Sequence, residues 1–194
     1  MPNKILEYRK IIELVDENAK ILDLGCGDGS LMFELKTKRN ARVQGIERDE
    51  KLIYVCVEKD LTVFHSSIEN AITAYPGNCF DYVILYNTFQ QIESIDTIIK
   101  ECFRIGKHAI VSFPNFAYIS ARKDLLFGKS PVTKNLPYQW YDSPNLRFLS
   151  IKDFENFCCK NNYKILNSFF FREKKEIAFF PNLLAQTATF VISK

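Results

Sequence analysis

The stretch ILDLGCGDG, residues 21–29, decides how the rest of the sequence is interpreted. Its first half is apolar and short enough for a strand, and residues 30–38 after it have the pattern of a helix. Glycines are needed where a backbone turns sharply or where a ligand approaches the main chain closely. The following helix offers free N–H groups and the positive end of its dipole. The stretch therefore predicts a strand, a ligand-binding turn and a helix.

Strands and helices alternate on both sides of this stretch. Strands are expected at 20–24, 42–47, 61–65, 80–86, 108–113, 163–171 and 188–193, and helices at 4–18, 30–38, 50–59, 95–104 and 150–159. Ser94 and Ser150 are the candidate caps of the last two helices. The alternation predicts a parallel sheet with helices on both faces.

An acidic residue follows the glycine turn at a characteristic distance. Glu47 lies 20 residues after Gly27, at the end of the second expected strand. A carboxylate there can accept hydrogen bonds from both hydroxyls of a ribose. The order of strand, glycine turn, helix and acidic residue predicts a site for an adenosine-containing cofactor. Without that ligand, we expect Glu47 to have little to hold.

The spacing of the glycines indicates which cofactor this is. The dinucleotide pattern is G-x-G-x-x-G, but here the third glycine, Gly29, comes one residue early and Ser30 follows it. Asp23, just before the turn, would repel a pyrophosphate but would favour an ammonium or sulfonium group. The pattern D-x-G-x-G-x-G therefore favours S-adenosylmethionine over NAD. The alternative is a glycine-rich turn that binds no ligand.

Composition excludes several classes of protein. No apolar run among the 194 residues approaches the length of a membrane span, and charges interrupt the N-terminal segment, so we expect neither a membrane protein nor a signal peptide. The six cysteines form no C-x-x-C pair and only two histidines are present, which argues against a metal site and suits a cytoplasmic protein. A net charge of +3 is too small to indicate nucleic-acid binding.

Residues 114–149 differ in texture from the rest. They contain four prolines and a cluster of aromatic residues, and such a long irregular segment is usually functional.

Charge is distributed unevenly along the chain. Residues 1–97 have 11 Lys+Arg against 16 Asp+Glu, whereas residues 98–194 have 15 against 7. The excess of positive charge is either a solvated face or a docking surface for an anionic ligand or acidic partner near Arg122, Lys123, Lys129 and Lys134.

The chain resembles class I methyltransferases and, more closely, the MetW family of methionine biosynthesis proteins. The similarity covers nearly the whole chain and rests on ILDLGCGDG (21–29), GIERDE (45–50), FDYVILYNTFQ (80–90), IVSFPNF (110–116) and LPYQWYDSPNLRFLSIKDFE (136–155). A length of 194 residues suits one domain, 1–194. The resemblance implies a doubly wound α/β fold with a mostly parallel, Rossmann-like sheet of seven strands and an antiparallel last strand. We expect segment 114–149 to lie on the ligand side. The resemblance also implies a role in methionine biosynthesis beside homoserine O-acetyltransferase.

The residue pattern and the resemblance together predict ten cofactor-binding residues. They are Asp23, Gly25, Cys26, Gly27, Gly29, Glu47, Arg48, Ser67, Ile68 and Tyr86. Two positions depart from the family pattern: Ser66-Ser67 stands where the family usually has Gly-Asp, and Tyr86-Asn87 where it usually has Ser-Gln. A serine hydroxyl can still bond adenine, but more weakly than a carboxylate.

No catalytic residue is assigned from the sequence. Methyl transfer from a sulfonium depends on in-line positioning more than on a strong acid or base. Two functions therefore remain open. One is a regulatory partner of the acetyltransferase that binds S-adenosylmethionine, and the other is an active methyltransferase with a small-molecule or protein acceptor. Segment 114–149 would serve as a docking surface in the first and as a lid in the second.

Overall fold

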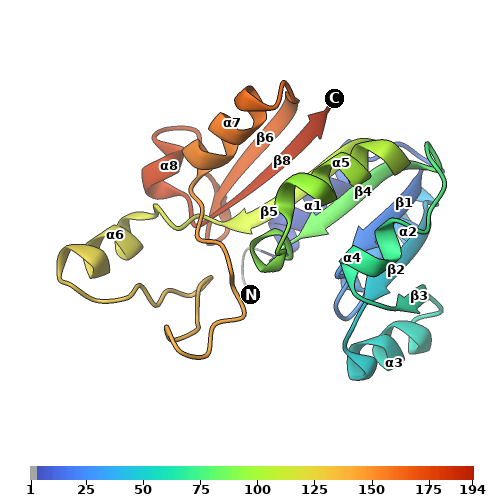
Figure 1. Ribbon diagram of the computed structural model, residues 1–194, viewed down its shortest axis with the longest axis horizontal. Helices are drawn as coiled ribbons and strands as arrows, with labels where there is room; N and C mark the ends of the chain where they lie inside the picture. The colour runs from blue at the N-terminus through green and yellow to red at the C-terminus, as the bar shows by residue number, and fades with distance from the viewer. Residues whose placement is uncertain (1–3) are drawn as a thin grey trace.

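The computed structural model describes residues 4–194 and is built on an eight-stranded sheet (Figure 1). The strands lie in the order β3 (Thr62–His65), β2 (Arg42–Glu47), β1 (Lys20–Leu24), β4 (Phe80–Tyr86), β5 (Gly106–Pro114), β8 (Thr187–Ser193), β6 (Lys164–Arg172) and β7 (Lys175–Glu176). The first five are parallel, β8 is antiparallel to β5, and β6 is antiparallel to β8. The expected doubly wound α/β architecture with an antiparallel last strand is confirmed.

The sheet has one strand more than expected. Strand β7 pairs with the end of β6 through Phe171 with Glu176 and Arg172 with Lys175. A strand of two residues carries no alternating pattern that a sequence could display. The seven longer strands are those expected, with boundaries shifted by at most two residues.

Helices cover both faces of the sheet. The α1 (Lys4–Leu14) and α2 (Ser30–Arg39) helices pack Ile11 and Leu35 against Ile21 and Ile84 of the sheet. On the other face, α4 (Ile68–Ile72), α5 (Ile95–Ile105) and α7 (Ile151–Lys160) cover the residues of β4 and β5 that point toward them. In Figure 1 the α5 and α7 helices lie in front of the sheet, and α3 (Glu50–Glu58) lies beside β3.

The alternation of side chains along β1 decides where its acidic residue lies. Leu22 and Leu24 belong to the core under α5, whereas Ile21 belongs to the core under α1. Because successive strand residues point to opposite faces, Asp23 lies on the same face as Ile21, the one covered by α1. The end of β1 therefore places a carboxylate inside the protein, directly before the glycine turn.

The helix boundaries show where local signals were sufficient. Ser150 and Asp153 form the expected capping box of α7. Ser94 precedes α5, but its side chain makes no cap hydrogen bond. The first helix ends at Leu14 rather than at residue 18, because the chain turns there and Asn18 adopts a left-handed conformation with φ of 61°.

Segment 114–149 contains one helix, α6 (Ile119–Leu126), followed by turns. A tight turn pairs Thr133 with Leu136 through two backbone hydrogen bonds. The segment extends away from the sheet in Figure 1. The sequence pattern missed α6, α4 and the short helices η1 (Phe89–Gln91) and α8 (Pro181–Leu184). Within residues 4–194, no helix is both long and apolar enough to cross a membrane.

Candidate functional site

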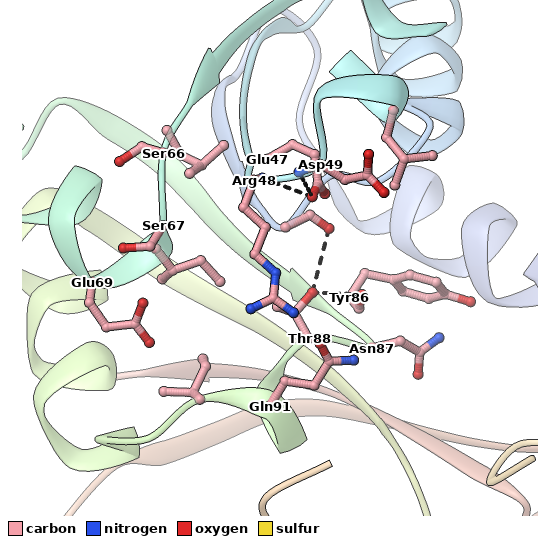
Figure 2. A pocket seen from close by; sticks show the side chains of 15 residues that line it. Glu47, Arg48, Asp49, Ser66, Ser67, Glu69, Tyr86, Asn87, Thr88 and Gln91 are labelled. Atoms are coloured by element: carbon pink, nitrogen blue, oxygen red, sulfur yellow. Dashed lines mark hydrogen bonds between the residues drawn. The ribbon is translucent and has the colours of Figure 1, made fainter. Parts of the chain in front are cut away.

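A pocket of about 340 Å³ opens where the parallel strands β1, β2 and β4 end (Figure 2). The strand order changes direction between β1 and β4, and ligands of open α/β sheets bind outside the carboxyl ends at such a point. The lining residues are Gly25, Ile46, Glu47, Arg48, Asp49, Leu52, Ser66, Ser67, Ile68, Glu69, Tyr86, Asn87, Thr88, Gln91 and Ile92.

The glycine turn has the backbone conformation that its composition predicts. Gly25, Gly27 and Gly29 have φ values of 78°, 58° and 68°, in the left-handed region that side chains other than glycine rarely adopt. The amides of Gly25 and Cys26 both donate to the carbonyl of Ile46, at 2.8 and 3.1 Å. These two bonds attach the turn to the end of β2.

The N-terminus of α2 is already occupied by a side chain of the turn. Asp28 accepts hydrogen bonds from the backbone N–H of Ser30 at 3.2 Å and from its hydroxyl at 2.7 Å. Partial burial opposes ionisation of Asp28, but the Ser30 bonds and nearby Lys4 and Lys59 hold its pKa below the usual range. We expected this helix end to be open to an anionic ligand group. Instead, a carboxylate lies where a phosphate would have to bind.

Glu47 also differs from expectation. Its Oε2 accepts from the amide of Gly27 at 2.9 Å, and its Oε1 accepts from the amides of Arg48 and Asp49 at 2.8 and 3.0 Å. Glu47 therefore holds the glycine turn to β2 even without a ligand. A carboxylate has about four acceptor positions, so one remains for a ligand hydroxyl while these three bonds persist.

Asp23 is a buried carboxyl group with an unused hydrogen-bonding position. It is only 2% exposed, and its Oδ1 has no hydrogen-bond partner. Burial, with a smaller contribution from the charge of Glu47, raises the pKa of Asp23 to about 7, although Lys4 opposes the shift. Such a group is suited to a cationic partner that enters its surroundings.

The side of the pocket next to β3 carries hydroxyl groups and a carboxylate. Figure 2 shows Ser66, Ser67 and Glu69 together on this side. The Ser67 hydroxyl caps α4 by accepting from the amide of Asn70 at 3.3 Å, which leaves its own proton available for a ligand. Glu69 supplies a carboxylate two residues after the position where the family pattern has one. Sequence reasoning missed it because α4 was not expected.

The structure brings six of the ten predicted residues together as pocket lining: Gly25, Glu47, Arg48, Ser67, Ile68 and Tyr86. Asp23, Gly27 and Gly29 do not line the pocket but belong to the end of β1 and the turn that borders it. Cys26 does not line it either, and its side chain packs in the core with Met32, Cys56 and Leu61. Among the lining residues that were missed, Asp49 and Thr88 lie within two residues of predicted ones, so the strand ends themselves were the available signal.

A second pocket of about 130 Å³ adjoins the first and shares Tyr86, Asn87 and Gln91 with it. Its other lining residues are Glu7, Gln90, Pro114, Asn135, Pro137, Tyr138, Asn145 and Thr187. The carboxylate of Glu7 accepts hydrogen bonds from the hydroxyls of Tyr86, at 2.5 Å, and Thr187. Sequence reasoning missed Glu7, although its place four residues before Ile11, on the apolar face of α1, was an available signal.

The described residues contain no group of three or more His, Cys, Asp or Glu side chains placed to hold a metal ion. The polar groups at the strand ends are carboxylates, hydroxyls and amides. Their chemistry suits hydrogen bonding to an organic ligand.

Comparison with known proteins gives one family and one fold. The family model described as methionine biosynthesis protein MetW matches residues 6–192. A relative from Rhodopirellula baltica, described as bifunctional methionine biosynthesis protein MetXA/MetW, is 29% identical over 197 residues, covering 94% of this chain and 32% of the relative. The chain thus spans about a third of that protein's length.

Two solved structures share the fold over almost the full length of both chains. One is a SAM-dependent methyltransferase from Archaeoglobus fulgidus, with a TM-score of 0.75, 15% identity, and coverage of 100% of this chain and 95% of that chain. The other is a putative S-adenosylmethionine-dependent methyltransferase from Listeria monocytogenes, with a TM-score of 0.73, 18% identity, and coverage of 99% and 96%. At these identities the similarity shows the class I methyltransferase fold alone.

Proposed function

The chain belongs to the MetW family of methionine biosynthesis proteins, and from this premise we propose that it binds S-adenosylmethionine and acts together with homoserine O-acetyltransferase. The fold, the glycine turn and the pocket at the strand ends support the first part. The fused architecture of the relative from Rhodopirellula baltica supports the second.

One observation carries the cofactor proposal: three carboxylates surround the glycine turn. Asp23 lies before it, Asp28 lies within it, and Glu47 is bonded to it. A pyrophosphate would be repelled by Asp28 and Glu47, and by Asp23 in its ionised form, whereas an ammonium or sulfonium group would be attracted. This arrangement supports S-adenosylmethionine and argues against a dinucleotide.

The residues present fit the parts of this cofactor. Glu47 would hold the ribose through its remaining acceptor position, and Asp23, with its unpartnered Oδ1, would hold the amino group of the methionyl part. Ser67 and Glu69 would bond the adenine, and Ile68 would give it an apolar contact. When bound, S-adenosylmethionine supplies an electrophilic methyl group.

Calorimetric titration tests this assignment. We expect binding of S-adenosylmethionine and of its demethylated product S-adenosylhomocysteine, and no binding of NAD. Measurable affinity for NAD together with none for the other two ligands would overturn the proposal. The glycine turn would be a structural feature without a ligand if none of the three bound.

The partner proposal has its own experiment. Homoserine O-acetyltransferase and this chain are co-expressed, one of them with an affinity tag, and purified. We expect the two to co-purify and the rate of the acetyltransferase to change when this chain is added. The absence of both a complex and a change in rate would contradict the proposed partnership with the acetyltransferase. We also propose that this partnership takes place in the cytoplasm, as suits a family of biosynthetic proteins.

The second pocket favours an additional function, active methyl transfer. It meets the first pocket at Tyr86, Asn87 and Gln91, so a molecule bound there would lie next to a cofactor bound in the first. Incubation with S-adenosylmethionine carrying a labelled methyl group, with and without the acetyltransferase, tests this alternative. Transfer of the label to the protein or to a small molecule would support methyl transfer. The absence of any label transfer would favour a regulatory role.

A further inference from the structure

We propose that the second pocket binds a small uncharged molecule with a carboxamide group. The proposal rests on the contacts of this pocket alone and holds whether or not the first pocket takes S-adenosylmethionine. Two side-chain amides, those of Gln90 and Asn135, line the pocket, and each has a buried polar atom without a hydrogen-bond partner among residues 4–194.

Gln90 presents a hydrogen-bond acceptor. It is 5% exposed, and its Nε2 donates to the carbonyl of Asn87 at 2.8 Å, which fixes the orientation of the amide. Its Oε1 is buried and has no partner. A buried acceptor of this kind is costly unless a ligand or water donates to it, so a ligand N–H group would be favoured there.

Asn135 presents a donor from another part of the chain. Its Nδ2 is buried without a partner, and the turn from Thr133 to Leu136 holds it in place. The segment that carries this turn is attached to Gln90, because the carbonyl of Gln90 accepts from the amides of Leu146 and Arg147 at 2.9 and 3.0 Å. A ligand carbonyl would satisfy the Asn135 donor.

The remaining lining residues of the second pocket disfavour a negatively charged ligand. Among the residues that the structure describes, no Lys, Arg or His lines the pocket, and Glu7 is buried in its wall. An anionic ligand would lose its hydration without meeting a cation. One free acceptor and one free donor, with no cation among the described lining residues, together match the N–H and C=O of an uncharged carboxamide.

Three probes of nearly the same shape test this inference on the unaltered chain. They are isobutyramide, which has both groups, 3-methyl-2-butanone, which lacks the N–H, and isobutyrate, which is anionic. Binding is followed by NMR through the side-chain NH₂ signals of Gln90 and Asn135. We expect isobutyramide to shift these signals and the ketone to bind about three- to tenfold more weakly, as for one lost hydrogen bond. Isobutyrate should bind most weakly.

Two variants and a matched control complete the experiment. Gln90→Met and Asn135→Leu remove the acceptor and the donor with little change in size, and each should weaken isobutyramide binding about three- to tenfold. Lys134→Met, in the same turn but not lining the pocket, should leave binding unchanged. Equal binding of isobutyrate and isobutyramide, or no shift with any probe because water alone satisfies the amides, would overturn the proposal. Should a variant fail to fold, the three-probe comparison decides alone.

Discussion

Asp23 combines burial, an unused hydrogen-bonding position and a raised pKa in one side chain. It is held inside the protein by the alternation of β1 and has no partner for Oδ1. Burial raises its pKa to about 7, so its charge changes near neutral pH. A buried acid whose pKa lies above that in the unfolded chain destabilises the ligand-free fold as pH rises, but becomes a better ligand for a cation over the same range.

The affinity for S-adenosylmethionine should therefore depend on pH through Asp23. If only the ionised carboxylate holds the ammonium group, affinity should rise about fivefold between pH 6 and pH 7, following the ionised fraction of a group with a pKa of about 7. Asp23→Asn should bind more weakly and lose most of this dependence. Titrations at several pH values measure the effect, and an equal pH dependence in both proteins would contradict the assignment.

The stability of the ligand-free protein should change in the opposite direction. The folded-state pKa of Asp23 is raised from 3.8 to about 7. The loss of folding stability caused by ionising this buried group is therefore absent in acid, grows as pH rises from about 4, and is complete above about 7. Asp23→Asn should gain stability relative to the wild type across this window. Thermal melts of the two proteins from pH 5 to pH 8 provide the measurement. A constant difference would mean that Asp23 is ionised throughout.

Glu47→Gln should affect both binding and stability. The loss of one charge-assisted bond to the ribose should lower affinity by about 1.5–3 kcal/mol, roughly ten- to a hundredfold. The amide nitrogen of glutamine cannot accept from the backbone amides that Glu47 now bonds, so unfolding free energy should fall by about 1–2 kcal/mol.

Glu58→Gln is the matched control for this change. Glu58 is the exposed last residue of α3 and lines neither pocket. Glu58→Gln removes the same charge as Glu47→Gln and should change neither the affinity for S-adenosylmethionine nor the unfolding free energy measurably. An unchanged affinity in Glu47→Gln would show that Glu47 only holds the turn.

Sequence reasoning was informative about individual residues where a strand ends. Glu47, Ser67 and Tyr86 line the pocket, and each ends a predicted strand or lies within two residues of its end. It failed where a partner comes from a distant element. The bonds of Glu47 to the turn, and of Glu7 to Tyr86, join residues 20 and 79 positions apart, and no local pattern encodes them.

At the scale of the element, the glycine turn is constrained differently at each of its glycines. A Cβ at Gly29 would lie 2.6 Å from Cδ1 of Leu61 and 2.8 Å from Sγ of Cys56. A Cβ at Gly27 would meet no atom within 4 Å. Both residues have positive φ, so conformation alone does not distinguish them. Gly29 is needed for packing against Cys56 of α3 and Leu61, the residue before β3, whereas Gly27 leaves open space beside the turn.

Alanine substitutions separate these two roles. Gly27→Ala should cost only the strain of a left-handed residue, about 1–2 kcal/mol. Gly29→Ala should cost this strain and a further 1–3 kcal/mol or so for overpacking. Chemical denaturation measures both losses. Equal losses would mean that Leu61 and Cys56 move aside without cost.

Whole elements were more predictable than their contacts. The strands that lead to the pocket were predicted within two residues, because a buried parallel strand is a short apolar run that ends in turn residues. The α4 helix was missed because five residues are too few to show a helical period. That omission hid Glu69, which lies in its first turn.

At the scale of the whole molecule, segment 114–149 contributes both pocket lining and exposed apolar side chains. Asn135, Pro137, Tyr138 and Asn145 line the second pocket. Other residues of the segment are large, apolar and exposed. Leu126 and Phe127 are 82% and 68% exposed, and Trp140 and Tyr141 are 78% and 71% exposed with their rings in edge-to-face contact. Aromatic residues are enriched in protein–protein interfaces, so these exposed side chains favour a docking surface.

The last prediction tests whether the exposed pair Trp140 and Tyr141 belongs to the docking surface for homoserine O-acetyltransferase. Trp140→Ser with Tyr141→Ser removes two exposed aromatic anchors without touching the core, so unfolding free energy should change by less than about 1 kcal/mol. If these side chains are central to the interface, the affinity for the acetyltransferase should fall by at least about 2 kcal/mol, roughly thirtyfold. Binding is measured with the two purified proteins.

Tyr54→Ser is the control, since Tyr54 is a 62% exposed aromatic residue on α3, at the far end of the sheet from α6 (Figure 1). It should bind the acetyltransferase as the wild type does. Titration with S-adenosylmethionine should give the same affinity in all three proteins, because none of the three residues lines the cofactor pocket. Loss of cofactor affinity in the double variant would indicate that the segment closes over the cofactor pocket. Unchanged affinity for both ligands would place the acetyltransferase on another face of the molecule.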